Sequence, residues 1–420
     1  MQALLKNSTK WLYLAVILTI PLLTPMIVNV GYEEVKVLIF LRVVLGLAFI
    51  FALTISITKT KLRFHSIYYV CFILLVTMLV TSVAGVNVSQ SFFGVRPYLQ
   101  GIITFLFLAI FSLLLYFQGI SSQLIKRTII LSTALVSVVA IFQYFQLQTG
   151  ALVPTYAGRV VSTFGQPNFY AGFLLITMPF LLEQITQSKR IEKIFFLATL
   201  ALNSAGIAIS FSRTAIILAA LVLSIWLIRN VIKTKILKLI MTGILVTGLF
   251  YALIPSRILE DELIQPFRNQ TVEFSNVQKR FFIWQIAIEQ IGKRPLLGYG
   301  LENIDEALPS DYDFNHPKPA FYHSIKDLTI DNTHNLFLNL LLWGGVVVFI
   351  SFIFLLAILY KSTKSLTLKV SLTIFLVWSF FQNLSLVHWL FFYILIAMIA
   401  VEANKSIDAT IKKKVQLTEK

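Results

Sequence analysis

The feature that most constrains this chain is a series of apolar runs, most of them long enough to cross a lipid bilayer. A transmembrane helix needs about 20 consecutive apolar residues. Such runs recur along the whole sequence, and hydrophobic residues make up 57% of its 420 residues. Only 13% of the residues are charged, about half the share typical of a soluble domain. The sequence therefore predicts an all-α integral membrane protein.

We predict twelve transmembrane helices within a single polytopic membrane domain that covers residues 1–420. The predicted spans are 11–30, 37–58, 66–84, 101–117, 128–147, 168–187, 194–210, 214–228, 239–254, 334–360, 366–382 and 387–402. The first span lacks an A-x-A cleavage site, so we expect a retained helix rather than a removed signal peptide. Only the polar stretch "QNLSLVH" separates the last two spans.

The charge distribution predicts the orientation of these spans. The chain has 35 Lys and Arg against 19 Asp and Glu, a net charge of +16. Basic residues gather in alternate loops, including "KTKLR", "KRIEK", "RNVIKTKILK" and the tail segment "IKKK". The positive-inside rule places these loops and both termini in the cytoplasm. The positive charge is thus explained by topology and by attraction to anionic membrane lipids, and no nucleic-acid partner is expected.

One loop on the predicted outer face, residues 255–333, is much longer than the others. Loops longer than about 15 residues usually have a function or are disordered. Within this loop, "SNVQKRFFIWQIAIEQIGKRPLLGYG" carries apolar residues at the spacing of an amphipathic helix. Pro295 and two glycines end the helical pattern. We expect this helix, inserted between the ninth and tenth spans, to lie on the membrane or on the bundle.

The candidate site residues are four arginines and one histidine that the predicted topology places on this same face. They are Arg96, Arg159, Arg213, Arg280 and His334, the last within "DNTHNLFLNLLLWGG". Taken singly, an interfacial arginine often snorkels or is solvated, and a histidine at the start of a helix is often structural. Together, several guanidinium groups facing one space match a phosphate or a diphosphate. An imidazole in the same space can act as a general base.

Metal and cofactor sites are not expected. The "DYD" at 311–313 has the form of a sugar-nucleotide D-x-D motif, but solvated loop acids explain it better on a face where nucleotide sugars are absent. His316, His323 and His334 lack the i, i+4 pairing of a helical zinc site. The single cysteine, Cys71, cannot form a disulfide within one chain.

Four motifs carry a resemblance to a known family over roughly residues 155–345. They are, in order, "RVVSTFGQPNFYAGFLLITMPFLL", "FSRTAIILAAL", "KRFFIWQIAIEQIGKRPLLGYGLEN" and "THNLFLNLLLWGG". The set resembles the O-antigen ligase and O-antigen polymerase (Wzy-type) superfamily. The resemblance implies a GT-C-like helical bundle and a metal-independent inverting glycosyltransferase without a cofactor. Such enzymes move a glycan from an undecaprenyl-diphosphate carrier to an acceptor on the outer face of the bacterial cytoplasmic (inner) membrane.

The resemblance also implies roles for individual residues. Matched motif by motif, Arg213 and Arg280 would clamp the donor diphosphate, and His334 would accept or orient the proton of the acceptor hydroxyl. Arg159 matches a frequent family arginine, whereas Arg96 is a candidate only from its predicted position. The acceptor could be the lipid A core, a growing polysaccharide or a protein, so ligase, repeat-unit polymerase and protein O-oligosaccharyltransferase stay open.

A transporter or flippase for a lipid-linked glycan is the alternative from a different class. Such a protein would also use arginines that face outward. It should, however, carry ionisable groups near the middle of the bilayer for ion coupling. Arg42 is the one clear mid-helix charge in the predicted spans. The sequence therefore favours the glycosyltransferase.

The predicted topology gives a first testable expectation. Reporter fusions at Ser310, in the long outer loop, and at Ser365, between the tenth and eleventh spans, should report opposite sides of the membrane. Alkaline phosphatase and green fluorescent protein fusions measure this directly. The same side for both positions would contradict the twelve-span topology.

Overall fold

The structure, a computed structural model, describes residues 2–25, 30–59, 61–146, 156, 158–230, 232–234, 274–308, 330 and 332–418. The regular elements within these ranges are all helices, apart from one isolated bridge between Tyr156 and Arg159. Many of these helices are long and apolar enough to cross a bilayer. The chain is therefore an all-α integral membrane protein that crosses the membrane several times, as predicted.

Eight helices have the length and hydropathy of membrane spans in this part of the chain. They are α2 (Tyr32–Thr58), α3 (Ser66–Val83), α6 (Ser122–Tyr144), α7 (Pro167–Gln187), α8 (Arg190–Ile209), α9 (Arg213–Asn230), α13 (Leu336–Ser362) and α15 (Leu386–Thr418). Shorter apolar helices are α1 (Gln2–Thr19) with the 3-10 turn η1 (Ile20–Leu22), α5 (Ile102–Gln118) and α14 (Leu366–Phe381). Three further helices are α4 (Val88–Phe93), α11 (Phe274–Lys293) and α12 (Ile304–Ala307).

Each predicted span except 239–254, which lies outside the described residues, overlaps one of these helices, although the bounds differ. The first helical segment, for example, ends at Leu22 and not at residue 30. The polar stretch between the last two predicted spans does separate two helices, because α14 ends at Phe381 and α15 begins at Leu386. The segment with the amphipathic pattern forms α11.

The predicted start of the second span is wrong. The helix α2 begins at Tyr32 and not at residue 37, so Glu33 and Lys36 are part of it, and both are buried. The Lys36 ammonium tolerates this position because it lies 3.8 Å from a Glu33 carboxylate oxygen and donates a 2.7 Å hydrogen bond to the carbonyl of Thr163. Arg42, the predicted mid-helix charge, is on the exposed face of α2.

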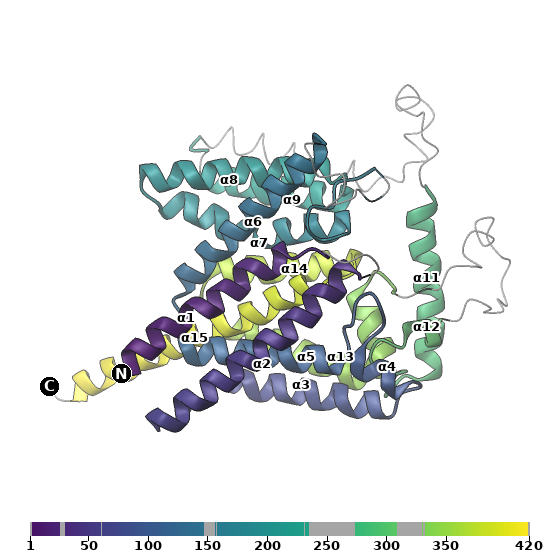
Figure 1. The fold of residues 1–420 in the computed structure, drawn as a ribbon, viewed down its shortest axis with the longest axis horizontal. Helices are drawn as coiled ribbons and strands as arrows, with labels where there is room; N and C mark the ends of the chain where they lie inside the picture. The colour runs from purple at the N-terminus through teal and green to yellow at the C-terminus, as the bar shows by residue number, and fades with distance from the viewer. Residues whose placement is uncertain are drawn as a thin grey trace.

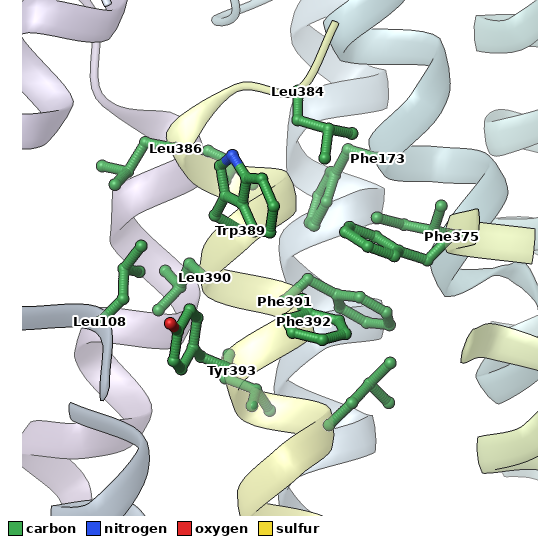
Figure 2. Packing of buried hydrophobic residues seen from close by; sticks show 14 of the residues in the cluster. Leu108, Phe173, Phe375, Leu384, Leu386, Trp389, Leu390, Phe391, Phe392 and Tyr393 are labelled. Atoms are coloured by element: carbon green, nitrogen blue, oxygen red, sulfur yellow. The ribbon is translucent and has the colours of Figure 1, made fainter. Parts of the chain in front are cut away.

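The centre of the bundle is formed by α7 and α15, the two most enclosed spans. Figure 2 shows the aromatic side chains of α15 packed against neighbouring helices. The rings of Phe375 and Phe392 stack with centroids 5.0 Å apart, and Phe391 lies 5.5 Å from Phe180 of α7. Burial of large aromatic side chains from three helices in one place fixes α7, α14 and α15 relative to one another.

The arrangement of the helices separates two ends of the bundle. In Figure 1 the start of α1 and the end of α15 lie together on the left, whereas α11 lies on the right and runs across the helix ends. We call this right-hand side the α11 end of the bundle. Both termini thus lie opposite α11, and the elements that follow all meet at the α11 end.

Close packing at Gly172 of α7 provides a test of the core. A methyl group at this position would lie 2.5 Å from Trp378 Nε1 and 2.6 Å from His388 Nε2, whereas Gly46 of α2 has nothing within 4 Å. We expect Gly172→Ala to destabilise the protein by about 1–3 kcal/mol, the usual cost of overpacking. Gly46→Ala, the matched control, should leave thermal unfolding in detergent unchanged or slightly improved. Equal melting temperatures for the two variants would contradict the packing of α7 against α14 and α15.

Candidate active site at the α11 end of the bundle

The helix α13 is broken near its start, at Gly344 and Gly345, where the backbone leaves the helical region. A break frees backbone N–H and carbonyl groups, and these must be paired within an apolar environment. Four backbone hydrogen bonds pair them with the segment 295–300, which follows α11. They run from Tyr299 N to Leu342 O (2.6 Å), from Gly300 N to Trp343 O (2.9 Å), from Val346 N to Pro295 O (2.8 Å) and from Val347 N to Leu296 O (3.5 Å).

The glycines in these two segments are explained by the same contact. Gly345 has a φ of 59° and Gly298 a φ of 62°, values that glycine adopts without strain. A Cβ on Gly345 would overlap the backbone of Leu296, and a Cβ on Gly298 would overlap the carbonyl oxygen of Leu342. The "PLLGYG" and "LLWGG" motifs are therefore two halves of one backbone interlock, which fixes the C-terminal end of α11 against α13.

Nearer its start, α11 is held in place by hydrogen bonds from two of its own side chains. Arg280 Nη1 donates a 2.8 Å hydrogen bond to the carbonyl of Phe381, and its Nη2 donates a 3.3 Å bond to Gln382 Oε1. One turn further along α11, Trp284 Nε1 donates a 2.8 Å bond to the carbonyl of Thr333. The helix thus connects the end of α14 with the residues that precede α13.

A network of Asn and Thr side chains holds His334 in an unusual backbone conformation. His334 has a φ of 56°, which is uncommon for a residue other than glycine. Asn332 Oδ1 accepts hydrogen bonds from His334 N (2.9 Å) and Asn339 Nδ2 (3.0 Å), and Asn339 Oδ1 accepts from Thr333 Oγ1 (2.6 Å). Asn335 caps α13 by accepting from two backbone N–H groups of its first turn, at 2.9 and 3.2 Å. The polar neighbours of His334 therefore fix the backbone from which its imidazole extends.

The imidazole of His334 is uncharged at neutral pH. Its side chain is half-buried, and Nδ1 is buried without a hydrogen-bond partner among the described residues. Burial lowers the pKa of His334 from 6.5 to about 4, and the positive charge of Arg280 lowers it in the same direction. Arg280 and His334 are therefore close enough to interact electrostatically. A neutral imidazole with a free nitrogen can accept a hydrogen bond or a proton.

The first turn of α9, which begins with Arg213, is connected to Arg280 through the side chain of Gln382. Arg213 is the first residue of α9, its side chain is exposed, and it makes no hydrogen bond or ion pair with any residue that the structure describes. The next residue, Thr214, accepts a long hydrogen bond of 3.5 Å from Gln382 Nε2, and Gln382 Oε1 is the group that accepts from Arg280. The α14–α15 loop, residues 382–385, thus brings the start of α9 and the middle of α11 together.

Arg159 lies beside the turn that leads into α9. Its Nε donates a 3.0 Å hydrogen bond to the carbonyl of Ser210, the residue that ends α8. Its Nη2 donates a 3.4 Å bond to Asn168 Oδ1. Arg159 therefore supports the turn before Arg213 with part of its donors, and its predicted role as a direct phosphate ligand stays a prediction.

Arg96 is at the border of this region. Its side chain is 79% exposed and forms a 3.3 Å ion pair with Glu34. Within the described part of the chain, no hydrogen bond or ion pair joins it to the other candidate arginines. Its near neighbour Gln100 donates a 2.8 Å hydrogen bond to the carbonyl of Leu384, so the Arg96 loop touches the α14–α15 loop from another side. The paired charge makes Arg96 the weakest of the predicted diphosphate ligands.

Sequence reasoning missed the side chains of the α14–α15 loop. Gln382 contacts two of the elements that carry candidate residues, and the N–H of Leu386 donates a 2.7 Å bond to Glu33 Oε2. The available signal was the polar interruption "QNLSLVH" between two apolar runs, which was used only to separate helices. Polar residues at such an interruption merit consideration as part of a site and not only as a break.

The fold and this region define a multi-pass membrane protein with a cationic, histidine-containing site at one end of a helical bundle. Residues 198–353 match the model of the family described as O-antigen ligase. This segment contains Arg213, Arg280 and His334 together with the interlock between α11 and α13. The match confirms the resemblance inferred from the four motifs: this segment is similar to the O-antigen ligase family.

A curated relative matches part of the chain. It is the ComP-specific O-oligosaccharyltransferase of Acinetobacter baylyi, which is 26% identical over 219 residues. The match covers 50% of this chain and 37% of the relative. The chain therefore aligns with well under half of that protein's length.

The electrostatics of His334 can be tested without any assay of function. Arg280→Gln removes a positive charge that disfavours the imidazolium, so the pKa of His334 should rise. Histidine-selective NMR in detergent, assigned with His334→Gln, should show a resonance titrating near pH 4 in the wild type and at higher pH in the variant. Arg42→Gln, on the exposed face of α2, is the control and should leave this titration unchanged. A wild-type midpoint near the ordinary value of 6.5 would contradict the buried, Arg280-facing imidazole.

Proposed function

We propose that this chain is an O-antigen ligase-like membrane glycosyltransferase. It transfers a glycan from an undecaprenyl-diphosphate carrier to an acceptor hydroxyl on the outer face of the bacterial cytoplasmic membrane, with both termini in the cytoplasm. The observation that carries the proposal is the gathering of Arg280, the start of α9 with Arg213, and His334 at one end of the bundle. The family match covers these same elements.

The two arginines suit a lipid-linked diphosphate. Arg280 is held in place by two hydrogen bonds, and its guanidinium has further N–H groups for a ligand. Arg213 is exposed, with its donors unengaged by described residues. Because Arg213 begins the membrane helix α9 and Arg280 contacts the end of α14, a polyprenyl tail can stay in lipid while its diphosphate reaches these cations. Planar guanidinium groups bind two phosphate oxygens at once.

The proposed reaction is a single displacement. The acceptor oxygen attacks the anomeric carbon, the bond from that carbon to the diphosphate oxygen breaks, and its electron pair leaves with undecaprenyl diphosphate. This inverts the anomeric configuration. Arg213 and Arg280 stabilise the negative charge on the leaving diphosphate, a role that needs no metal in this proposal. His334 takes the proton of the acceptor hydroxyl; a weak base suffices, because that proton becomes strongly acidic as the new bond forms.

The identity of the acceptor distinguishes the three enzyme types that could carry out this reaction. Ligase, repeat-unit polymerase and protein O-oligosaccharyltransferase share the donor and differ in what supplies the hydroxyl. The partial match to a relative named as an O-oligosaccharyltransferase favours transfer of an oligosaccharide to a specific O-linked acceptor as the second candidate. Deleting the gene and identifying both the lipid-linked glycan that accumulates and the glycoconjugate that disappears distinguishes these variants.

The clamp and the base have different expected mutational signatures. Arg213→Lys keeps the charge but loses the planar fork, so transfer should fall by about 10²-fold, the scale seen when one preorganised donor is removed. His334→Ala should abolish transfer while donor binding persists, because it removes a proton acceptor and not a phosphate ligand. The measurement is glycan transfer from purified polyprenyl-diphosphate donor, with donor binding measured in parallel.

Two controls complete this test. Arg42→Lys, on the exposed face of α2 with a hydrogen bond only to Leu38 of its own helix, should transfer glycan normally. Wild-type activity should persist in EDTA, because the proposal uses no metal. Full activity of both Arg213→Lys and His334→Ala, or loss of wild-type transfer on chelation, would end this mechanism.

A further inference from the structure

Gln382 connects the two elements that carry the candidate arginines. It directly follows Phe381, the last residue of α14, and only 5% of it is exposed. Its side-chain oxygen accepts from Arg280 Nη2 at 3.3 Å, and its side-chain nitrogen donates to Thr214 Oγ1 at 3.5 Å. A single amide thus makes both contacts, one toward α11 and one toward the first turn of α9.

The loop behind Gln382 is held rigidly by buried polar groups. Gln100 Nε2 donates to the carbonyl of Leu384 at 2.8 Å, and Glu33 Oε2 accepts from the N–H of Leu386 at 2.7 Å. Between these, Ser385 Oγ lies 2.7 Å from His388 Nδ1. Every one of these groups is at least nine-tenths buried. Gln382 is therefore presented from a fixed backbone, as is needed for a residue that orients another side chain.

We propose that Gln382 is a positioning residue for the diphosphate clamp. Its neutral amide holds the guanidinium of Arg280 in a fixed orientation next to α9 and leaves the full positive charge of Arg280 available to the donor. Gln382 itself touches no substrate. The inference rests on the proposed function, because it assigns to Arg280 the binding of a polyprenyl diphosphate.

The effect of the neutral charge of Gln382 can be tested separately from the effect of its hydrogen bonds. A glutamate has the same shape, accepts the same hydrogen bond from Arg280, and can accept one from the Thr214 hydroxyl. Gln382→Glu therefore preserves the contacts that a purely structural role requires. It also places a negative charge against Arg280 and offsets the charge that would attract a diphosphate.

The first experiment measures binding of undecaprenyl diphosphate to the purified full chain, together with the melting temperature. Gln382→Glu should melt at or above the wild-type temperature and bind the probe at least about tenfold more weakly, the loss expected for one weakened charge-assisted contact. The matched control is Gln184→Glu. Gln184 is also buried in a side-chain amide pair, with Gln123, but it lies at the far end of α7, away from the start of α9. Its probe affinity should be that of the wild type.

A second pair of variants tests whether Gln382 acts through Arg280. Gln382→Leu removes both hydrogen bonds without adding charge, and it should lower kcat/KM for transfer by about tenfold in the wild-type background. In the Arg280→Gln background the same change should cause almost no further loss, because residues that act as one unit are not additive. Equal relative losses in both backgrounds would show that Gln382 acts independently, and would overturn the inference.

The outcomes separate this inference from the proposed function. If the wild type does not bind undecaprenyl diphosphate, the proposed function and the role of Gln382 both fall. If the wild type binds the probe and Gln382→Glu binds it equally well, only the role of Gln382 falls. A large drop in the melting temperature of Gln382→Glu would indicate that the amide serves the fold, and would also overturn the inference.

Discussion

A membrane helix that breaks must find partners for its freed backbone groups, and the candidate site depends on how this chain does so. The break at Gly344 and Gly345 in α13 is paired by four hydrogen bonds to segment 295–300. In an apolar environment each unpaired group costs several kcal/mol. The interlock therefore joins a loop segment to a spanning helix through backbone groups alone. The identity of a residue there matters mainly at Gly298 and Gly345, where a Cβ would collide with the opposite backbone.

This interlock fixes two candidate site residues relative to each other. His334 precedes α13 by two residues, and Arg280 is on α11, so the break joins the elements that carry them. The hydrogen bond from Trp284 to the carbonyl of Thr333 forms a second tie between the same elements. Arg280 then reaches across to the α14–α15 loop. A site assembled from loops and helix ends acquires the rigidity of the bundle in this way, which preorganised catalysis requires.

The features that could be predicted from the sequence are those that depend on residues close together in the chain. Bilayer thickness sets the length of an apolar run, so the spans could be located, and the period of apolar residues identified α11. The motifs around Arg213, Arg280 and His334 pointed to one family, which the match over 198–353 confirmed. The buried start of α2 was missed, because Lys36 is tolerated there through Glu33 and also through Thr163, which is remote in sequence. Gln382 was missed for the same reason: its partners lie on α9 and α11.

Within the proposed function, the charge of Arg280 links donor binding to the strength of the base. In the free site this charge and burial together keep the pKa of His334 near 4. A diphosphate bound to Arg280 brings negative charge that offsets the guanidinium, and negative charge beside an imidazole raises its pKa. His334 thus becomes a stronger proton acceptor when the donor is in place. Before that, the neutral imidazole adds no positive charge to the pocket. A single arginine therefore stabilises the leaving diphosphate directly and also controls, through its charge, how strongly His334 accepts the proton of the acceptor hydroxyl.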